Sequence, residues 1–435
     1  MTSLEVRFKN KKIGVISLDS SSKVCHFQYD NGFINSDIEL SPIKMPISDT
    51  MYSFNDSSYE TFRGLPGLFD GSLPDKFGSL AFDVWLKMKK VDKDSFNILD
   101  WLSFIGNCGM GALEYYPTLD NVSPSSKKTM LNDLVDFANK ILNDKENALI
   151  KTDEEEMENI INACCFAGGA RAKAIVAYNK EKDEFKPGYI DAGECYEYYI
   201  LKLDGIKNNK DKEDADKSEF TRIEYAYYLM ALDAGINMME CKLYKDGDYY
   251  HFMTKRFDRY VKDGKMQKRH MQTLCDMMHY DFNTPRIVSY EEVANIIIKL
   301  EKSNKNIEQF YRRMVFNVIT RNQDDHLKNI SFIMDQKGTW SLSPAYDVTF
   351  AFNPNGFWTC EHQMMINGKT KDITLDDLIC SAKSMGIDDL KAKGIITEIN
   401  SVVSNWSKYA KTAYLSDETI NEIESKFIFL LDECL

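Results

Sequence analysis

Short apolar runs alternate with polar breaks over the first part of the chain. Residues 4–40 carry VRF, IGVISL, CHFQY and GFI between polar, Gly and Asn positions. This alternation is typical of short antiparallel strands, so the pattern predicts a small meandering sheet. A turn-rich connector at residues 64–78, GLPGLFDGSLPDKFG, precedes predicted helices around Leu80–Lys89 and Ile98–Phe104. We expect this β-rich subdomain to cover residues 1–120.

A second module is predicted over residues 121–258. Apolar residues recur at helical spacing from Met130, and SPSS just before them is a plausible start signal for a helix. Dense mixed charge at residues 206–218 favours a solvated loop. A helix predicted at about 219–233 is surrounded by four strand-like segments, namely AKAIVAYN (172–179), CYEYYILKL (195–203), ECKLY (240–244) and YYHFMTKRFD (249–258).

The pattern becomes helical after about residue 260, and we expect a helical lobe over residues 259–435. Ser289 and Glu292 have the spacing of a capping box. One apolar stripe follows, formed by Ile307, Phe310, Tyr311, Met314, Val315, Val318 and Ile319.

The composition fits a globular chain with more than one core. Of 435 residues, 43% are hydrophobic, which is enough for two lobes or three subdomains.

No apolar stretch reaches the roughly eighteen residues of a membrane span, and the start lacks a signal-peptide pattern, so a cytoplasmic protein is expected. The ten cysteines lack CxxC spacing and are expected to be reduced thiols. A net charge of −13 disfavours direct binding to nucleic acid, so any DNA contact is expected through a partner.

Candidate chemistry is concentrated in residues 320–348, TRNQDDHLKNISFIMDQKGTWSLSPAYDV. Asp324 is followed five positions later by Asn329, and Asp347 comes after two predicted strands, ISFIM and TWSLS, joined by a DQKG turn. Phosphoryl transfer needs a carboxylate to orient the attacking hydroxyl and oxygen ligands to hold Mg²⁺ between phosphates. The catalytic loop and the metal-binding Asp of protein kinases have this order and spacing.

This pattern predicts a role for each polar residue of the segment. We expect Asp324 to act as the base, Asn329 and Asp347 to hold Mg²⁺, and Lys328 to neutralise phosphate charge. His326 is expected to organise the loop. In the alternative interpretation, the DDH triplet and Asn329 are ordinary turn residues.

A phosphate clamp is predicted upstream, in FAGGARAKAIVAYN at residues 166–179. A pair of glycines lets the backbone approach an anion closely. The segment is neither a Walker A motif nor GxGxxG, and the alternative interpretation is an ordinary turn before a strand. The candidate nucleotide-binding residues of this clamp are Gly168, Gly169, Ala170, Arg171 and Lys173.

Other nucleotide-binding candidates lie farther along the second module. Lys202 lies in an apolar strand and needs a charge partner, for which phosphate and Glu224 are the candidates; the alternative is an amine at a strand edge. The segment FMTKRF at residues 252–257 is the expected hinge between the lobes, and Lys255 within it is a nucleotide-binding candidate. Phe257 is expected either to stack near the adenine or to pack in the core. Gln272 is a further candidate for the nucleotide pocket.

Several of these segments together resemble the HipA family, the kinase-like toxins of bacterial toxin–antitoxin modules. The chain is similar to the N-terminal subdomain of this family in the segments GLFDGSLPDKFG and IGNCGMGALEYYP. It is similar to the phosphate loop of the family in GGARAKA and to the hinge in KRFDR. It is similar to the C-terminal lobe of the family in RNQDDHLKNISF, in SPAYDV and in QMMINGK with the following ITLDDL. The resemblance covers nearly the whole chain, with the motifs in the same order.

The resemblance implies an α+β, two-lobed protein-kinase-like fold with an N-terminal α/β lobe, an extra β-rich subdomain and a mostly helical C-terminal lobe. It implies an ATP- and Mg²⁺-dependent serine/threonine protein kinase that arrests growth. It also implies a small HipB-like helix-turn-helix antitoxin that carries the toxin to operator DNA. Known members phosphorylate an aminoacyl-tRNA synthetase, but nothing in this sequence shows the target.

The chain departs from the family at one regulatory position. Phe166 stands where the family often has a serine whose phosphorylation expels the loop, so we expect self-inactivation to be missing or to use another site such as Thr152.

Two other functions stay open. One is a metal-dependent phosphohydrolase with Asp324, Asp325, His326 and Asp347 as ligands. The other is a catalytically inactive, nucleotide-binding co-repressor scaffold.

Overall fold

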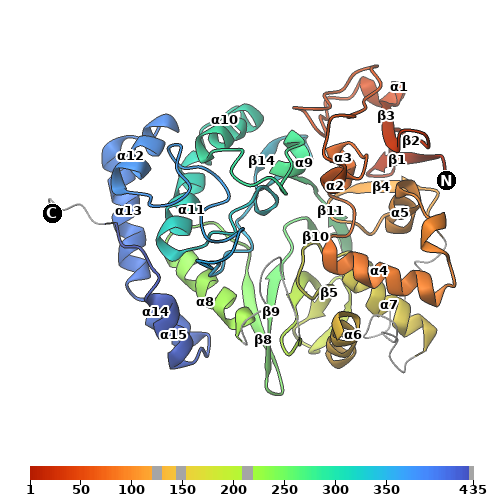
Figure 1. The fold of residues 1–435 in the computed structure, drawn as a ribbon. Coiled ribbons are helices and arrows are strands. Elements are labelled where there is room, and N and C mark those ends of the chain that lie inside the picture. The colour runs from red at the N-terminus through yellow and green to blue at the C-terminus, as the bar shows by residue number, and fades with distance from the viewer. Residues whose placement is uncertain (120–129, 144–152, 208–218, 431–435) are drawn as a thin grey trace. The chain divides into compact units, whose positions relative to one another are not determined.

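The computed structural model describes residues 1–119, 130–143, 153–207 and 219–430, which form two compact units (Figure 1). The first unit comprises Met1–Asp211, Met253–Asp281 and Ser331–Thr339. The second comprises Lys212–Phe252, Phe282–Ile330 and Trp340–Leu435. Both mix helices and strands, which confirms the α+β class. Because the chain passes between the units several times, the division at residues 120 and 258 stays a prediction.

The first unit contains most of the strands. They are β1 (Ser3–Phe8), β2 (Lys11–Asp19), β3 (Val24–Tyr29), β4 (Leu113–Tyr116), β5 (Lys173–Asn179), β6 (Glu184–Pro187), β7 (Glu197–Lys202), β9 (Tyr249–Lys255) from Met253 onward, β10 (Arg259–Lys262), β11 (Lys265–Lys268), β12 (His270–Thr273) and β13 (Ser331–Met334). Its helices are α1 (Asn31–Ile34), α2 (Tyr59–Phe62), α3 (Gly67–Asp70), α4 (Lys76–Met88), η1 (Lys93–Ser95), α5 (Ile98–Ile105), α6 (Leu131–Asn143), α7 (Glu154–Cys165) and α9 (Leu274–Met278).

The N-terminal sheet has the order β3-β2-β1-β4, with antiparallel neighbours. Every second residue of β1 is buried, as the alternating pattern predicts for a sheet with one covered face. The predicted helices at 80–89 and 98–104 are confirmed as α4 and α5. The strand expected at GFI is wrong, because Asp30 accepts a hydrogen bond from the Gly32 backbone N–H and caps the short helix α1 there.

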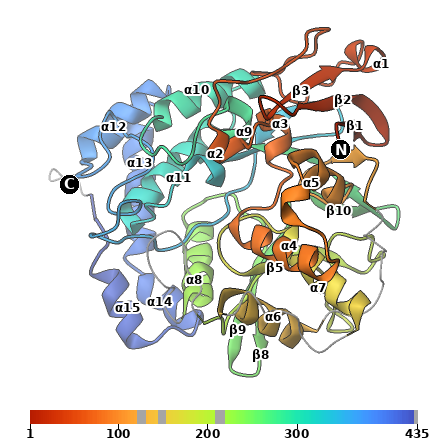
Figure 2. The same ribbon diagram turned by 45° about the vertical axis from the view of Figure 1, so that its right-hand side comes forward.

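A second sheet of this unit has the order β6-β5-β7-β9. All seven residues of β5 are buried, which explains the continuous apolar run AKAIVAYN. Helix α7 packs against β5 and against α4 (Figure 2). The helical pattern expected after residue 260 is wrong over β10, β11 and β12. Asp263 and Gly264 both have positive φ, the hairpin turn that a DG dipeptide favours.

The second unit is mainly helical. It contains α8 (Phe220–Asp233), α10 (Tyr290–Glu301), α11 (Ile307–Thr320), α12 (Leu375–Ser384), α13 (Asp389–Val403), α14 (Trp406–Thr412), α15 (Asp417–Glu424), η2 (Leu327–Asn329), β8 (Cys241–Asp246), the start of β9 and β14 (Trp340–Leu342). None of the described helices has the length and apolarity that a membrane span requires.

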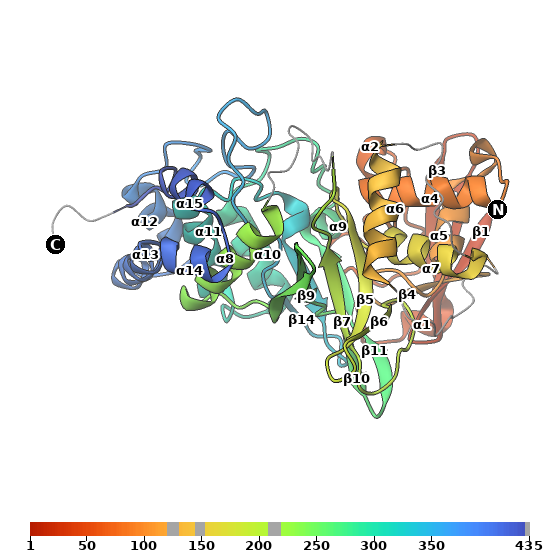
Figure 3. The same cartoon turned by 90° about the horizontal axis from the view of Figure 1, so that it is seen from below.

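Helix α11 lies among the helices of this unit and leads into the predicted catalytic segment. It packs against α10 and α13, and Figure 3 shows it among the other helices of the unit. Its predicted apolar stripe is buried. The neighbouring helix α10 begins with the predicted capping box of Ser289 and Glu292, whose two hydrogen bonds measure 3.2 and 2.8 Å. At the end of α11, Tyr227 of α8 donates to the Thr320 carbonyl at 2.6 Å. The residues that follow Thr320 therefore start from a fixed position.

A buried ion cluster in the first unit joins two sequence motifs. Asp258 accepts from Arg256 Nε and Nη2 and from Arg259 Nη1, each at 2.8 Å. The Gly111 backbone N–H also donates to Asp258, at 2.9 Å, and Arg259 donates to the Gly109 and Gly111 carbonyls at 2.5 and 2.7 Å. The KRFDR and GNCGMGALEYYP segments are thus held together by charge-assisted hydrogen bonds.

Burial and charge act in opposite directions on these groups. Burial alone would raise the pKa of Asp258, but the charges of Arg256 and Arg259 hold that pKa well below its usual range. Burial lowers the pKa of Arg259 to about 10, opposed by the charge of Asp258. Asp258 is therefore a buried anion whose removal leaves two buried cations together.

Replacing that anion should destabilise the first unit. Because breaking a buried ion pair costs about 3–5 kcal/mol, we expect Asp258→Asn to lower the free energy of unfolding by that amount. Asp263→Asn, at an exposed turn of the same unit, should change it by less than about 0.5 kcal/mol. Urea denaturation followed by tryptophan fluorescence measures both variants. Equal midpoints for the two variants would contradict a structural role of the cluster.

Candidate active site

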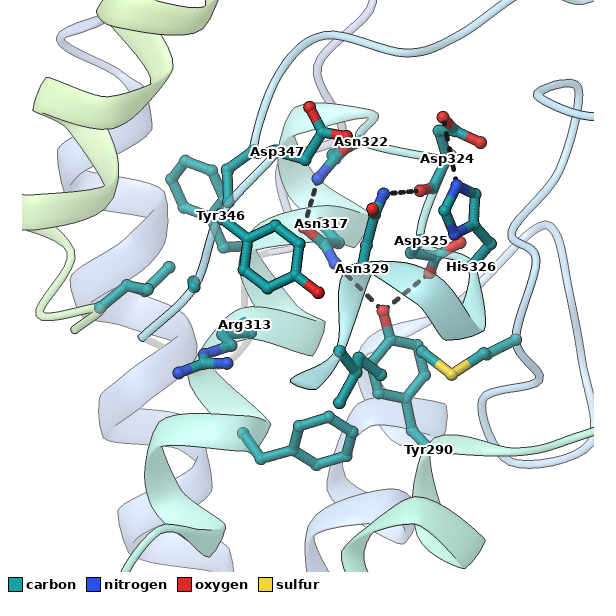
Figure 4. A pocket seen from close by; sticks show the side chains of 17 residues that line it. Tyr290, Arg313, Asn317, Asn322, Asp324, Asp325, His326, Asn329, Tyr346 and Asp347 are labelled. Carbon is teal, nitrogen blue, oxygen red and sulfur yellow. Dashed lines mark hydrogen bonds and ion pairs between the residues drawn. The ribbon is translucent and has the colours of Figure 1, made fainter. Parts of the chain in front are cut away.

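A pocket in the second unit brings Asp324, Asn329 and Asp347 together (Figure 4). It lies at the end of α11 and is also lined by α10 and by the chain after β14. The three side chains are half-buried, so each is accessible to a ligand in the pocket. The two ends of the predicted catalytic segment therefore meet in the fold.

The backbone between Thr320 and Asp324 is fixed by the chain that follows Asp347. Arg321 ends α11 in the left-handed region, with φ 59°. Its carbonyl accepts from the Ala351 N–H at 3.1 Å, and the Gln323 N–H donates back to the Ala351 carbonyl at 3.0 Å. This pair of backbone hydrogen bonds sets the register between the segments that carry Asp324 and Asp347.

Asn329 is oriented by the backbone of Asp324. Its Nδ2 donates to the Asp324 carbonyl at 2.9 Å, and its own N–H donates to the His326 carbonyl at 2.9 Å. The first bond turns the Asn329 side-chain carbonyl oxygen away from the loop. A carbonyl oxygen is the type of ligand that Mg²⁺ prefers, as the sequence predicts for Asn329.

His326 organises this loop. Its Nδ1 accepts from the Lys328 N–H at 3.2 Å and caps η2, so the ring proton lies on Nε2 in the neutral form. Nε2 lies 3.9 Å from Asp324 Oδ2. The Lys328 ammonium lies over the Phe282 ring at 4.4 Å. His326 can thus bias the orientation of the Asp324 carboxylate without being a reacting group.

Asp325 is the buried anchor of the loop. One carboxylate oxygen, Oδ2, accepts from Tyr290 Oη at 2.7 Å and lies 2.8 Å from His362 Nδ1, while Oδ1 accepts from the Gln363 N–H at 2.7 Å. Its side chain is 1% exposed. Burial, followed by the charge of Asp325, raises the pKa of Tyr290 well above its ordinary value, so Tyr290 stays a hydrogen-bond donor.

The hydrogen-bond chain continues from Tyr290 into the wall of the pocket (Figure 4). Tyr290 Oη accepts from Asn317 Nδ2 at 3.1 Å, and Asn317 Oδ1 accepts from Asn322 Nδ2 at 2.9 Å. Asn322 is 4% exposed, and among the described residues its Oδ1 has no hydrogen-bond partner. A further amide oxygen therefore lies buried in the pocket wall.

Asp347 is held in an uncommon backbone conformation, with φ 56°. The residues before it are tied down, since Tyr346 Oη donates to the Lys328 carbonyl at 2.6 Å and the Ala345 N–H to the Asn237 carbonyl at 2.8 Å. A non-glycine residue in the left-handed region needs such support and is frequent at functional sites. These contacts aim Asp347 into the pocket with Asn329.

The candidate metal ligands in this pocket are oxygen atoms, which suits Mg²⁺ rather than zinc. Asp347, Asn329 and Asn322 can supply carboxylate and amide oxygens, the hard ligands of Mg²⁺. Across the described ranges, no group of three His, Cys, Asp or Glu side chains could hold a metal alone. Because Asp325 uses both carboxylate oxygens in hydrogen bonds, it does not fit the ligand set of the phosphohydrolase interpretation.

Arg313 was not anticipated from the sequence. It lines the pocket from α11, and its Nη2 donates to the Ser343 carbonyl at 2.6 Å. Burial lowers its pKa to about 10. It still carries a positive charge at neutral pH and lines the same pocket as the carboxylates.

The predicted phosphate clamp lies in the first unit, in the turn before β5. Gly169 has φ 107° and donates its N–H to Asp75 Oδ2 at 2.7 Å. The Lys173 amine lies against the Gly169 backbone, and the positive φ of Gly169 is a conformation that favours glycine. Gly168, Ala170 and Arg171 belong to the same turn. Their contact with a nucleotide stays a prediction.

Lys173 and Lys202 are directly opposite each other on β5 and β7. Each is 6% exposed, which makes this part of the sheet a concentration of buried positive charge. Phosphate is the predicted ligand of this charge. Glu224 lies on α8 of the second unit and is buried. Its pairing with Lys202 stays a prediction.

The remaining nucleotide candidates belong to the first unit. Lys255 pairs with Glu197 of the neighbouring strand β7. The Phe257 carbonyl accepts from Arg269 Nη1 at 3.3 Å. Gln272 is 3% exposed, and neither of its amide atoms has a hydrogen-bond partner within the described part of the chain. An unpaired buried amide suits the edge of a base, but this role also stays a prediction.

Phe166 has a structural role in the first unit. Its ring lies 5.8 Å from that of Phe104 and 5.3 Å from that of Tyr189, and its residue is 3% exposed. The position that often carries a serine in the resembling family is thus part of an aromatic core here. Thr152, the other site considered, lies outside the described residues.

Family models match both halves of the chain. The model described as the HipA N-terminal domain matches residues 4–116, and the one described as the HipA-like C-terminal domain matches residues 165–406. A toxin–antitoxin complex of HipA, HipB and operator DNA from Shewanella oneidensis contains a chain with a TM-score of 0.68 and 16% identity. That match covers 97% of this chain and 95% of that one, so the two share a fold.

Two curated relatives match shorter segments. A putative kinase of Sinorhizobium fredii, Y4dM, is 42% identical over 52 residues, or 12% of this chain and 13% of that protein. A putative kinase of Haemophilus influenzae is 29% identical over 106 residues, or 22% of this chain and 30% of that protein. The chain thus spans less than a third of either relative. The C-terminal family model alone covers more than half of the chain, which therefore belongs to the HipA family.

Proposed function

We propose that this protein is an ATP- and Mg²⁺-dependent kinase that transfers the γ-phosphate to a serine or threonine hydroxyl of another protein. The observation that carries the proposal is the meeting of Asp324, Asn329 and Asp347 in one pocket. Two relatives named putative kinases and the HipA-type fold support it.

In the proposed reaction the carboxylate of Asp324 accepts the proton of the acceptor hydroxyl and orients that hydroxyl for attack. Its side chain is 29% exposed, so a substrate can reach it. Asn329 and Asp347 would hold Mg²⁺, which when bound neutralises charge on the phosphates. Lys328 would neutralise further charge on the transferred group. Asp325 and His326 act by keeping the loop in place.

Residues of the first unit would bind the nucleotide. Lys173 and Lys202 supply buried positive charge for its phosphates, with the turn from Gly168 to Lys173 over them. The FMTKRF segment and Gln272 would contact the adenine. This assignment follows the resemblance to the family and the unpaired state of the Gln272 amide.

A HipB-like helix-turn-helix antitoxin is the proposed protein partner, and growth arrest the proposed outcome. The solved relative was crystallised with HipB and operator DNA, and the net charge of −13 favours an indirect contact with DNA over a direct one. The protein substrate belongs to the class of soluble proteins with an exposed hydroxyl. An aminoacyl-tRNA synthetase is the candidate that the family suggests.

The kinase proposal is tested by labelling a bacterial lysate with radioactive ATP and Mg²⁺. The unmodified protein should label one or a few proteins, and Asp324→Ala should reduce the rate by about 10²–10⁴-fold, because general-base catalysis is lost. Asp376→Ala, an exposed carboxylate of the same unit, serves as the matched control and should label normally. Bound ATP without any labelling by the unmodified protein would favour the co-repressor scaffold.

Metal binding provides an independent prediction. Mn²⁺ can replace Mg²⁺ and is observed directly by electron paramagnetic resonance in the presence of a non-hydrolysable ATP analogue. Asp347→Ala should weaken its binding by at least the roughly 10–100-fold that even outer-shell changes cost. Removing metal with a chelator should stop labelling. Unchanged Mn²⁺ affinity in Asp347→Ala would exclude Asp347 as a ligand.

Asp325 is predicted to be a positioning residue. Asp325→Asn cannot accept all three hydrogen bonds, and weakening one or two such bonds to a charged group costs about 2–4 kcal/mol. We expect kcat to fall by more than about tenfold while the KM for ATP changes little. Far-ultraviolet circular dichroism checks that the variant is folded. A folded variant with normal kcat would show that the network only stabilises the lobe.

A further inference from the structure

An exposed aromatic pair lies in the turn that follows Asp347. We call residues 353–361 the aromatic turn. The Gly356 N–H donates to the Asn353 carbonyl at 3.0 Å, and the Asn353 N–H donates to the Thr359 carbonyl at 3.3 Å, so the turn closes on itself. Phe357 at its tip is 63% exposed, and its ring meets that of Trp358 edge to face at 5.1 Å.

Three side chains from outside hold the backbone of the aromatic turn. Arg286 Nη2 donates to the Phe357 carbonyl at 3.0 Å, and Gln363 Nε2 donates to the Trp358 carbonyl. The amide of Gln323, oriented so that its oxygen accepts from Arg321, donates to the Thr359 carbonyl at 2.9 Å. Three consecutive carbonyls are thus satisfied, and the backbone of the turn is held in place.

The residues that hold the aromatic turn are themselves connected to the catalytic loop. The Gln363 N–H donates to Asp325 Oδ1 at 2.7 Å, and the Arg286 N–H donates to the Gln363 carbonyl at 2.7 Å. Gln323 directly precedes Asp324 in the chain. The backbone that carries Phe357 is therefore tied to the segment of the proposed base by contacts on both sides of it.

The charge that lies against this ring is compensated. Arg286 lies 5.6 Å from the Phe357 ring, but its charge is paired with Glu361 at 3.2 Å. Ile287, next to Arg286, is 43% exposed. An acidic segment would find no uncompensated cation among these residues, whereas an apolar side chain could cover the rings. Rigid aromatic side chains in such positions are typical anchors of protein interfaces.

We propose that the aromatic turn is the substrate-docking element of the kinase, and that it binds an apolar side chain next to the acceptor hydroxyl of the protein substrate. The inference rests on the proposed kinase function. It adds the class of sequence that the site selects, through Phe357 as the specificity-determining residue. Because the turn is already ordered, docking costs little conformational entropy.

The test compares phosphorylation of bacterial lysate proteins by the unmodified protein, Phe357→Ala and Phe357→Leu, with ATP and Mg²⁺ held constant. Mass spectrometry identifies the labelled sites, and ATP affinity is measured separately. Phe357→Ala should reduce labelling about tenfold or more, as expected for loss of an interface anchor, with unchanged ATP affinity. Phe357→Leu should keep most of it. Leu390→Ala, 83% exposed at the start of α13, is the matched control and should label normally.

Each outcome decides between separate statements. Apolar residues flanking the labelled sites, together with the loss in Phe357→Ala, would support the docking element. Equal labelling by Phe357→Ala, or flanking residues that are acidic or basic, would overturn it while leaving the kinase intact. If the unmodified protein binds ATP and labels nothing, the kinase proposal fails, and the docking inference is rejected with it.

Discussion

The geometry of the candidate active site depends on one buried carboxylate, that of Asp325. A charge with a 1% exposed side chain is tolerated only because Tyr290, His362 and the Gln363 backbone surround it with hydrogen bonds. These partners come from α10 and from the chain after β14. Asp325 therefore fastens the loop of its neighbour Asp324 to two other segments of the helical unit, and the Asn317–Asn322 chain extends that order into the pocket wall.

The first unit relies on the same kind of interaction. Asp258 binds two buried arginines there, and the backbone of Gly109 and Gly111 completes the cluster. Both anchors lie within motifs by which the chain resembles the HipA family. Some residues of these motifs thus shape the loops around which the proposed nucleotide and metal ligands are arranged, whereas others, such as Asp324 and Asp347, line the pocket.

The sequence allowed local features to be predicted better than long-range ones. The sequence predicts that Asp324 and Asn329 lie together because they are close in the chain, and it predicts the burial of β5 from its apolar run. Asp325 seemed a turn residue or a metal ligand, because its partners lie 35 to 38 positions away and periodicity carries no information about them. The strands at 259–273 were missed, although their DG turn was visible.

The most direct test of this account is a crystal structure with Mg²⁺ and a non-hydrolysable ATP analogue. It should show the metal on the Asn329 side-chain oxygen and the Asp347 carboxylate, with the terminal phosphate facing Asp324. The loop should keep the Asp325 hydrogen bonds seen here. A metal held by Asp325 or His326, or a nucleotide bound away from this pocket, would contradict the assignment of these residues.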